Sequence, residues 1–293
     1  MSEKKKTVVA LGGFDGLHKA HRKLIEKTKE YAKEHGILSG VLLFDKLPSE
    51  VFLENAKRIM KLSDKKALLD DVDFLYEQKF DTEFMSMSDE DFAKFLVDKL
   101  NVRAVCAGFN YRFGKNAKGD IFALEEYGKK YGFEVLKMQE YKICGVTVSS
   151  TKIREFIENG DMVKAKEFLG REFFMTGKVL GGYGLGRTFG FPTVNLEYDK
   201  NSVLPKFGVY SGTVLANGKI YKAVINVGKR PTFQREDVTI ESFLLDFSGD
   251  LYDKEIKVSF IEFLREEKKF PDASSLAEQI NKDIERVKEN GRN

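Results

Sequence analysis

The chain has 293 residues, of which 42% are hydrophobic and 32% charged, and its 49 basic and 46 acidic side chains leave a net charge of +3. This length favours two domains, and the mixture is that of an ordered globular protein. A net charge so close to zero gives no chain-wide field for binding nucleic acid. The expected partners are therefore small molecules, and no obligate protein partner is implied.

Targeting and metal signals are weak. No stretch approaches the ~20 apolar residues of a membrane span, and the apolar segment after the basic N-terminus breaks at Gly12-Gly13, too early for a signal peptide. Cys106 and Cys144 lie in apolar segments, which predicts reduced, buried thiols. Three histidines and two cysteines nearly exclude a structural zinc site. We expect a soluble cytoplasmic protein that does not contact membranes.

The first half alternates between short apolar runs and amphipathic stretches. Strands are expected at 7–11, 38–44, 72–80, 103–108 and 133–139, and helices at 18–35, 64–71, 88–100 and 120–131. The first helix is predicted from four residues that share one face, Leu24, Thr28, Tyr31 and Ala32. Such alternation predicts a doubly wound parallel sheet, in which ligands bind at the carboxyl ends of the strands where the strand order reverses.

Two short helices, 151–159 and 161–169, are expected next, each ended by a glycine. The domain boundary is placed near the second of these, Gly170, which gives domains of 1–170 and 171–293. Strands are then expected at 173–180, 193–196, 209–215, 220–227, 238–247 and 255–263. Asn217-Gly218 is a strong hairpin signal. The pattern is typical of an antiparallel barrel or sandwich, followed by an amphipathic helix over 274–288 that carries Leu276, Ile280, Ile284 and Val287 on one side.

The segment GGFDGLHKAHRKLI joins the first strand to the first helix. Its glycines allow a ligand close to the backbone, and the free amides of a helix start attract anions. His18 and His21 are three residues apart and so project on the same helix face. Two imidazoles there could hydrogen-bond the phosphoryl oxygens of a nucleotide under attack. On this segment alone, helix capping or metal binding are equally open.

This segment resembles the HxGH-type signature of nucleotidylyltransferases, and its Gly-x-Phe-Asp-Gly start resembles that of the bacterial bifunctional riboflavin kinase/FAD synthetases. Two further stretches agree with that family, GFNYRFGKNAKGD from Gly108 to Asp120 and the pyrophosphate-binding type segment VSSTKIR from Val148 to Arg154. The resemblance implies a catalytic role for the histidine pair and phosphate or nucleotide binding by Gly12, Phe14, Asp15, Gly16, Asn110, Arg112, Ser150, Thr151 and Arg154. By themselves, Ser150 and Thr151 could be no more than helix caps, while Arg154 offers a forked cation for pyrophosphate.

A second glycine-rich run, GKVLGGYGLGRTFGFPTVNL, opens the C-terminal half. Thr193 and Asn195 are two apart in an expected strand, so their oxygens share a face and could hold one hard cation with bound phosphate. A polar outer face of an edge strand fits that spacing as well. The run is similar to the flap and Pro-Thr-x-Asn motif of riboflavin kinase domains, and the likeness continues through TIESFLLDF to about Lys288.

That likeness implies that Thr193 and Asn195 position Mg²⁺ with ATP and that Glu241 is the base for the ribityl 5′-hydroxyl of riboflavin. A base within reach of the attacking hydroxyl is what phosphoryl transfer asks of the protein. Arg265 is expected next to the flavin or nucleotide, although a surface ion pair is an equal alternative. The flap implies nucleotide contacts for Gly182, Gly184 and Gly186. The substrates and products would be ATP, riboflavin, FMN and FAD.

Three positions depart from the family pattern: Ala20 replaces a glycine between the histidines, Lys46-Leu47-Pro48 stands where a Pro-His-Pro element is usual, and Ser242 stands where histidine is common. Two other functions stay open. The chain could be a nucleotidylyltransferase for another phosphate ester with the barrel as a flavin-binding module, or a non-enzymatic flavin- or RNA-binding barrel. A P-loop is rejected because GFNYRFGKN lacks its spacing and its last residue.

Overall fold

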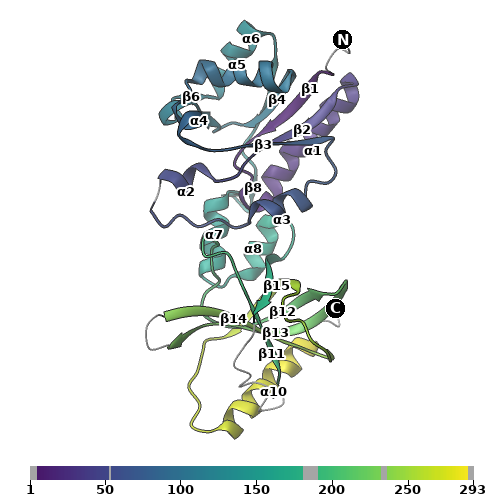
Figure 1. Cartoon of the computed structure of the whole chain (residues 1–293), viewed down its shortest axis with the longest axis vertical. Helices are drawn as coiled ribbons and strands as arrows, with labels where there is room; N and C mark the ends of the chain where they lie inside the picture. The colour runs from purple at the N-terminus through teal and green to yellow at the C-terminus, as the bar shows by residue number, and fades with distance from the viewer. Residues whose placement is uncertain (1–4, 53, 181–190, 232–235, 290–293) are drawn as a thin grey trace. The chain divides into compact units, whose positions relative to one another are not determined.

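The structure, a computed structural model, describes residues 5–52, 54–180, 191–231 and 236–289. The chain divides into two compact units, Met1–Ser150 and Thr151–Asn293 (Figure 1). The second unit contains the two helices that follow residue 150 together with the barrel. The functional boundary near Gly170 therefore stays a prediction, about 20 residues after the point where the compact units divide.

The first unit is built on a five-stranded parallel sheet, as predicted. Its strand order is β3-β2-β1-β4-β7. The chain builds the sheet outward from β1 in one direction through β2 and β3, and then in the other direction through β4 and β7, so the strand order reverses at β1. The strands are β1 (Thr7–Leu11), β2 (Leu38–Phe44), β3 (Phe74–Gln78), β4 (Val102–Gly108) and β7 (Glu134–Met138). Every residue of β1 is buried, as its central position in the sheet requires.

Helices cover both faces of this sheet. Along β1, Val8 belongs to a cluster with Tyr31 and Ala32 of α1, whereas Val9 belongs to a larger cluster with α5 and α6 on the opposite face. This division follows from the alternation of side chains along a strand. The helices are α1 (Lys19–His35), α2 (Pro48–Phe52), α3 (Leu62–Ala67), α4 (Thr82–Ser86), α5 (Asp89–Leu100) and α6 (Ile121–Tyr131). The short α2 and α4 were not expected, and α3 ends earlier than expected.

Local capping explains the helix boundaries in this unit. His18 caps α1, Ser88 caps α5 with a hydrogen bond from the amide of Asp91, and Asp120 caps α6. The connections contain two 3₁₀ turns and two short hairpins: η1 (Asp15–Leu17), η2 (Lys115–Ala117), β5 (Arg112–Phe113) with β6 (Gly119–Asp120), and β8 (Lys142–Ile143) with β9 (Val146–Thr147).

The two cysteines differ in environment. Cys106 is buried in β4, as expected. The prediction that Cys144 is buried is wrong, because this residue is exposed in the turn between β8 and β9. Its φ of 47° and the φ of 80° at Gly145 form a tight two-residue turn, which carries its side chains away from any core.

The second unit begins one residue into α7 (Ser150–Glu158) and continues with α8 (Met162–Leu169), which Gly170 ends in the left-handed conformation. A closed antiparallel barrel follows, as predicted, with the order β10-β11-β14-β13-β12-β15. Its strands are β10 (Phe173–Leu180), β11 (Thr193–Leu196), β12 (Gly208–Ala216), β13 (Lys219–Pro231), β14 (Glu236–Leu244) and β15 (Glu255–Arg265). Asn217 and Gly218 form the β12–β13 turn with positive φ at both positions, as their sequence predicts.

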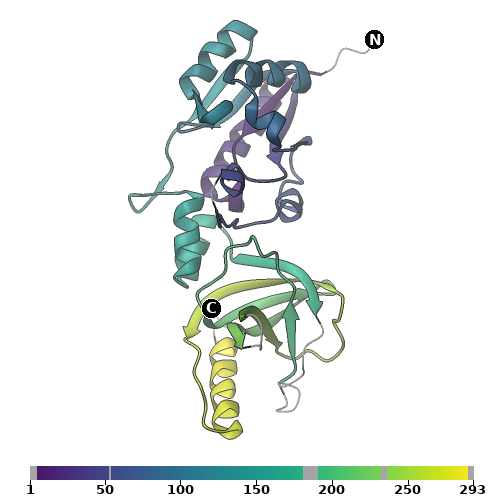
Figure 2. The same cartoon turned by 60° about the vertical axis from the view of Figure 1, so that its left-hand side comes forward.

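The terminal helix α10 (Ala273–Glu289) packs on the outside of this barrel (Figure 2). Its residues Ile284 and Val287 are buried against Val209 of β12 and Leu264 of β15. The apolar stripe predicted for this helix is therefore the surface that joins it to the barrel. Helix α10 therefore covers part of the outer wall of the barrel.

Candidate active sites

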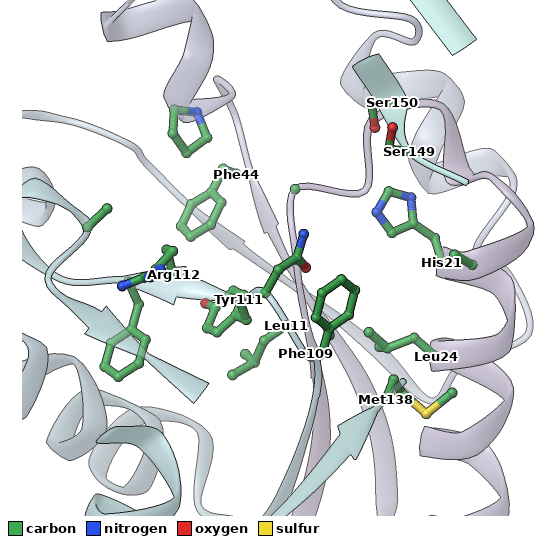
Figure 3. A pocket seen from close by; sticks show the side chains of 18 of the residues that line it. Leu11, His21, Leu24, Phe44, Phe109, Tyr111, Arg112, Met138, Ser149 and Ser150 are labelled. Carbon is green, nitrogen blue, oxygen red and sulfur yellow. The ribbon is translucent and has the colours of Figure 1, made fainter. Parts of the chain in front are cut away.

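A cavity of about 660 Å³ lies in the first unit at the carboxyl ends of its parallel strands (Figure 3). Leu11, Phe44, Gly108 and Met138 are the last residues of β1, β2, β4 and β7, and all four line the cavity. The cavity therefore occupies the place where the strand order predicts a ligand.

The histidine pair lies on the wall of this cavity. The rings of His18 and His21 are stacked, with centroids 3.6 Å apart and planes 11° from parallel. His18 precedes α1 and accepts a hydrogen bond at Nδ1 from the His21 amide, 3.3 Å away, so it is the helix cap that the sequence left open as an alternative. Capping does not exclude a role toward a ligand, because both residues line the cavity.

His21 is held in its neutral form. Burial lowers its pKa well below the ordinary 6.5, and the nearby charges of His18 and Lys65 lower that pKa further. Its Nδ1 is buried, and no described residue gives this atom a hydrogen-bond partner. Figure 3 shows the ring on the wall of the cavity that also carries Ser149 and Ser150. A buried polar atom without a partner at a cavity wall is a feature expected of a ligand contact.

The loop between β1 and α1 divides into residues that face the cavity and residues that support it. Gly12 and Gly13 line the cavity. Phe14, Asp15 and Gly16 are buried and do not line it, and the Asp15 carboxylate accepts hydrogen bonds from the amides of residues 59 and 60. The side chain of Asp15 thus holds the loop to a neighbouring segment, and a phosphate contact by these three residues stays a prediction.

The second predicted nucleotide segment also reaches the cavity. Asn110 and Arg112 both line it, and the Oδ1 atom of Asn110 lies over Gly108, where a Cβ would be only 3.3 Å away. Arg112 is exposed, 4.0 Å from Asp120. Figure 3 shows Tyr111 and Arg112 on the side of the cavity opposite His21. Glycine at 108 therefore leaves room for an amide at the end of β4.

The predicted pyrophosphate segment is split between the two units. Ser150 lines the cavity, and its hydroxyl donates to the carbonyl of Asp15 at 2.9 Å. Thr151 and Arg154 lie in the second unit, on the first turn of α7, where the guanidinium of Arg154 donates to the Thr151 hydroxyl at 3.4 Å. Their contact with a nucleotide stays a prediction.

One part of this cavity was not found from the sequence. Four of the phenylalanines that line it come from three segments of the chain and form one cluster, with ring centroids of neighbours 5.2 to 6.2 Å apart: Phe44, Phe52, Phe80 and Phe84. Phe52 is 63% exposed. The chain has 25 phenylalanines, so composition could not single out these four. An aromatic wall beside a polar one suits a ligand with a flat ring system and a phosphate.

A second cavity, of about 450 Å³, lies on the outer wall of the barrel. Thr193 of β11 and Glu241 of β14 line it, and the Thr193 hydroxyl lies 3.5 Å from a carboxylate oxygen of Glu241. Asn195 is buried and directly opposite Glu241 in the strand pairing, so the two side chains share a face. The two strands thus bring Thr193 and Asn195 together with Glu241, which follows Thr193 by 48 positions in the sequence.

The register adds a residue that sequence reasoning missed. Asn226 of β13 is directly opposite Glu241 on the other side and also lines the cavity. The next residue of β14, Ser242, is buried on the opposite face of the strand, beside Ile225. The departure from histidine at 242 therefore does not alter the side-chain set of this cavity. No short motif marks Asn226, because its place depends on strand pairing.

Arg265 lines the second cavity, but its guanidinium is bound to the protein. Its Nε and Nη2 donate to the carboxylate of Asp283 at 2.8 to 3.2 Å, and its Nη1 donates to the Glu266 carbonyl at 3.1 Å. Asp283 is 1% exposed and also accepts from Gln279. The pair fastens α10 to the barrel, so an ion pair is present, although it is buried and not at the surface. A flavin contact by Arg265 stays a prediction.

The donor set of the second cavity suits a hard cation. The threonine hydroxyl, the asparagine amide carbonyl and the glutamate carboxylate all offer oxygen atoms, which are the ligands that Mg²⁺ prefers.

Gly182, Gly184 and Gly186, which were expected to contact the nucleotide, lie outside the described residues. Two other departures fall in the first unit, where Ala20 lines the cavity and Leu47 is buried near Gly13.

No helix in the described part of the chain is long and apolar enough to cross a membrane.

Comparison with known proteins gives two family models that together span most of the chain. The model described as FAD synthetase matches residues 1–152, and the model described as riboflavin kinase matches residues 169–290. The two matches therefore contain one cavity each.

Full-length relatives agree with these two matches. The chain is 36% identical to a bifunctional riboflavin kinase/FMN adenylyltransferase of Haemophilus influenzae, over 96% of this chain and 92% of that one. It is also 36% identical to the protein of the same description from Bacillus subtilis, over 96% and 91%. A crystal structure titled as a macrolide-efflux protein from Streptococcus pneumoniae has a TM-score of 0.89 at 29% identity, over 98% of this chain and 95% of that one. The chain belongs to the family of bifunctional riboflavin kinase/FMN adenylyltransferases.

Proposed function

We propose that this chain converts riboflavin to FAD in two steps, phosphorylating riboflavin to FMN in the barrel and adenylylating FMN in the parallel-sheet unit. The observation that carries this proposal is that each of the two family matches contains its own cavity with its own chemistry. One cavity combines paired imidazoles with an aromatic wall, and the other combines a carboxylate with oxygen donors. Both steps use ATP, and the first releases ADP while the second releases pyrophosphate.

In the parallel-sheet unit, FMN supplies a phosphate oxygen that attacks the α-phosphorus of ATP. His18 and His21 lie where the loop amides and the start of α1 attract that phosphate. Neutral His21 can donate one hydrogen bond to an oxygen that gains charge in the transition state. The aromatic wall around Phe44 and Phe80 supports binding of the isoalloxazine ring. Thr151 and Arg154 are proposed to bind the leaving pyrophosphate.

In the barrel, Glu241 is proposed to accept the proton of the ribityl 5′-hydroxyl as that oxygen attacks the γ-phosphorus of ATP. Thr193 and Asn195 share the face of Glu241 and would hold Mg²⁺, which neutralises phosphate charge when it is bound. Asn226 lies opposite the base and would orient either it or the hydroxyl. Apolar side chains, among them Leu276 and Ile280 of α10, form another part of the cavity wall, and this part suits the flavin ring.

The direct test is to incubate the purified chain with riboflavin, ATP and Mg²⁺ and to separate the products by chromatography. The proposal expects FMN first and FAD after it, with pyrophosphate released in step with FAD. A second incubation starts from FMN. A nucleotidylyltransferase for another phosphate ester would turn over neither flavin, and a flavin-binding module would bind riboflavin without consuming ATP. Either of those results would overturn the proposal.

A further inference from the structure

Lys65 is a buried lysine behind the loop that joins β1 to α1. The residue is only 3% exposed, although lysine is rarely buried without a partner. Its ammonium donates a hydrogen bond to the carbonyl of Gly13 at 3.3 Å. Lys65 comes from α3 and does not line the cavity. Its ammonium therefore reaches the loop from outside the lining of the cavity.

The surroundings of Lys65 contain both signs of charge. The carboxylates of Asp15 and Glu50 and the guanidinium of Arg58 are the charged groups that act on it. Asp15 accepts hydrogen bonds from the amides of residues 59 and 60, and Glu50 forms an ion pair with Arg58 at 2.6 Å. Burial is the largest effect on Lys65 and lowers the pKa of its ammonium. A buried charge is screened by solvent far less than an exposed one.

The contact with Gly13 has a consequence for the loop. Gly12 and Gly13 line the cavity, and a loop that binds phosphate must present amide groups and not carbonyl oxygens to the anion. A carbonyl that accepts from a buried ammonium is fixed on the side of the ammonium. Glycine alone would leave this peptide group free to rotate, because it restricts the backbone least. The lysine therefore supplies an orientation that the loop sequence lacks.

We propose that Lys65 is a positioning residue for FMN adenylylation, which fixes the Gly13 carbonyl away from the phosphates and places a buried positive charge behind them. This inference rests on the proposed function of the parallel-sheet unit. The charge of Lys65 also acts on His21, whose pKa it lowers together with burial and His18. Lys65 thus acts on both groups that line this wall, the loop backbone and the imidazole.

The test replaces Lys65 by methionine, which keeps the length of the side chain and removes the charge. We expect Lys65→Met to reduce kcat for FAD formation from FMN at least tenfold, with a smaller change in KM for FMN. The same substitution at Lys66 is the matched control, because Lys66 follows on the same helix, is only partly buried and pairs with Glu77. Riboflavin phosphorylation by the same preparation reports only on the other unit, so the proton NMR spectrum of the variant is used to show that the parallel-sheet unit is folded.

A second readout separates positioning from mere structural support. The proton NMR titration of His21 should move to higher pH in Lys65→Met, stay in place in Lys66→Met and return toward the parent value in Lys65→Arg, which restores the charge. The rate of FAD formation should likewise fall in Lys65→Met, stay unchanged in Lys66→Met and return toward the parent rate in Lys65→Arg. Parent-like FAD formation by Lys65→Met would overturn the proposal, as would a loss of activity with an unmoved His21 titration. The titration does not require turnover, so it can fail or succeed independently of the proposed function.

Discussion

His18 lies face to face with His21, and Nδ1 of His18 accepts the hydrogen bond of the His21 backbone amide. One ring therefore caps the helix, while the other keeps a buried nitrogen to which no described residue gives a hydrogen bond. Two stacked imidazoles cannot both carry a proton without strong repulsion. The two residues of one short motif consequently differ in role, with His18 fixed by the protein and His21 available to the ligand.

Replacing His21 by alanine should slow FAD formation from FMN by at least an order of magnitude and spare riboflavin phosphorylation. A donor preorganised toward developing phosphoryl charge is worth roughly 3–4 kcal/mol. His35→Ala is the control, because His35 stacks on Tyr31 at the other end of the same helix. Steady-state rates from FMN and from riboflavin measure the two steps separately. An unchanged FMN-to-FAD rate in His21→Ala would remove His21 from the site.

The pKa of His21 should be found below 6.5 in an NMR titration, because burial and the charges of His18 and Lys65 disfavour its protonated form. The unfolded chain then binds this proton more tightly than the folded one. The contribution of His21 to the free energy of unfolding is therefore complete above about pH 6.5 and decreases as the pH falls from there toward the folded-state pKa. Urea unfolding at several pH values measures this effect. In His21→Asn, the free energy of unfolding should decrease less between about pH 6.5 and the folded-state pKa of His21 than it does in the parent. A titration midpoint at or above 6.5 contradicts the assignment.

Replacing Glu241 by glutamine should abolish FMN formation from riboflavin and leave FAD formation from FMN intact. Glutamine keeps the size and hydrogen bonding of the side chain but cannot accept the proton. Glu255→Gln, an exposed substitution on barrel strand β15, which does not pair with β14, is the control. Parent-rate phosphorylation by Glu241→Gln would show that another group is the base.

Mixing the two inactive variants tests whether the sites work separately. FMN is a free product that can leave one molecule and enter another, so Glu241→Gln with His21→Ala should restore conversion of riboflavin to FAD. The lag before FAD appears should shorten as enzyme concentration rises. If both folded variants are inactive toward both flavins, the activities are not divided between 1–170 and 171–293.

Replacing Asp283 by alanine should destabilise the barrel by ~3–5 kcal/mol, because the substitution leaves the Arg265 guanidinium buried without its carboxylate. Urea unfolding followed by circular dichroism measures the change. Glu285→Ala on the same helix is the matched control, since its ion pair with Lys288 is exposed and contributes little. A loss of riboflavin affinity in Arg265→Lys at unchanged stability would instead favour the flavin contact predicted for Arg265.

Much of the fold could be predicted because its signals are local. The buried face of α1 and the Asn217-Gly218 turn each depend on residues within a few positions of one another. Cys144 shows the limit of such reasoning, because an apolar segment around it resembles a strand although a two-residue turn occupies its centre.

The site residues that sequence reasoning missed depend on contacts between distant segments. Asn226 lies opposite Glu241 because of the register between β13 and β14. The aromatic wall of Phe44, Phe52, Phe80 and Phe84 combines side chains from three segments of the chain. Lys65 has no motif, and its importance is visible only once α3 lies against the Gly13 carbonyl. In contrast, His18, His21, Thr193 and Glu241 belong to motifs whose order along the chain is itself informative.

The alternation along β14 has an evolutionary consequence. Ile240 and Ser242 belong to the hydrophobic interior, whereas Glu241 between them faces the outer cavity. Insertion or deletion of one residue in this strand would exchange the acid for a buried neighbour and expose the interior at the same time. Such an event removes chemistry and stability together, so descendants of this barrel can vary in loop length far more readily than in the length of β14.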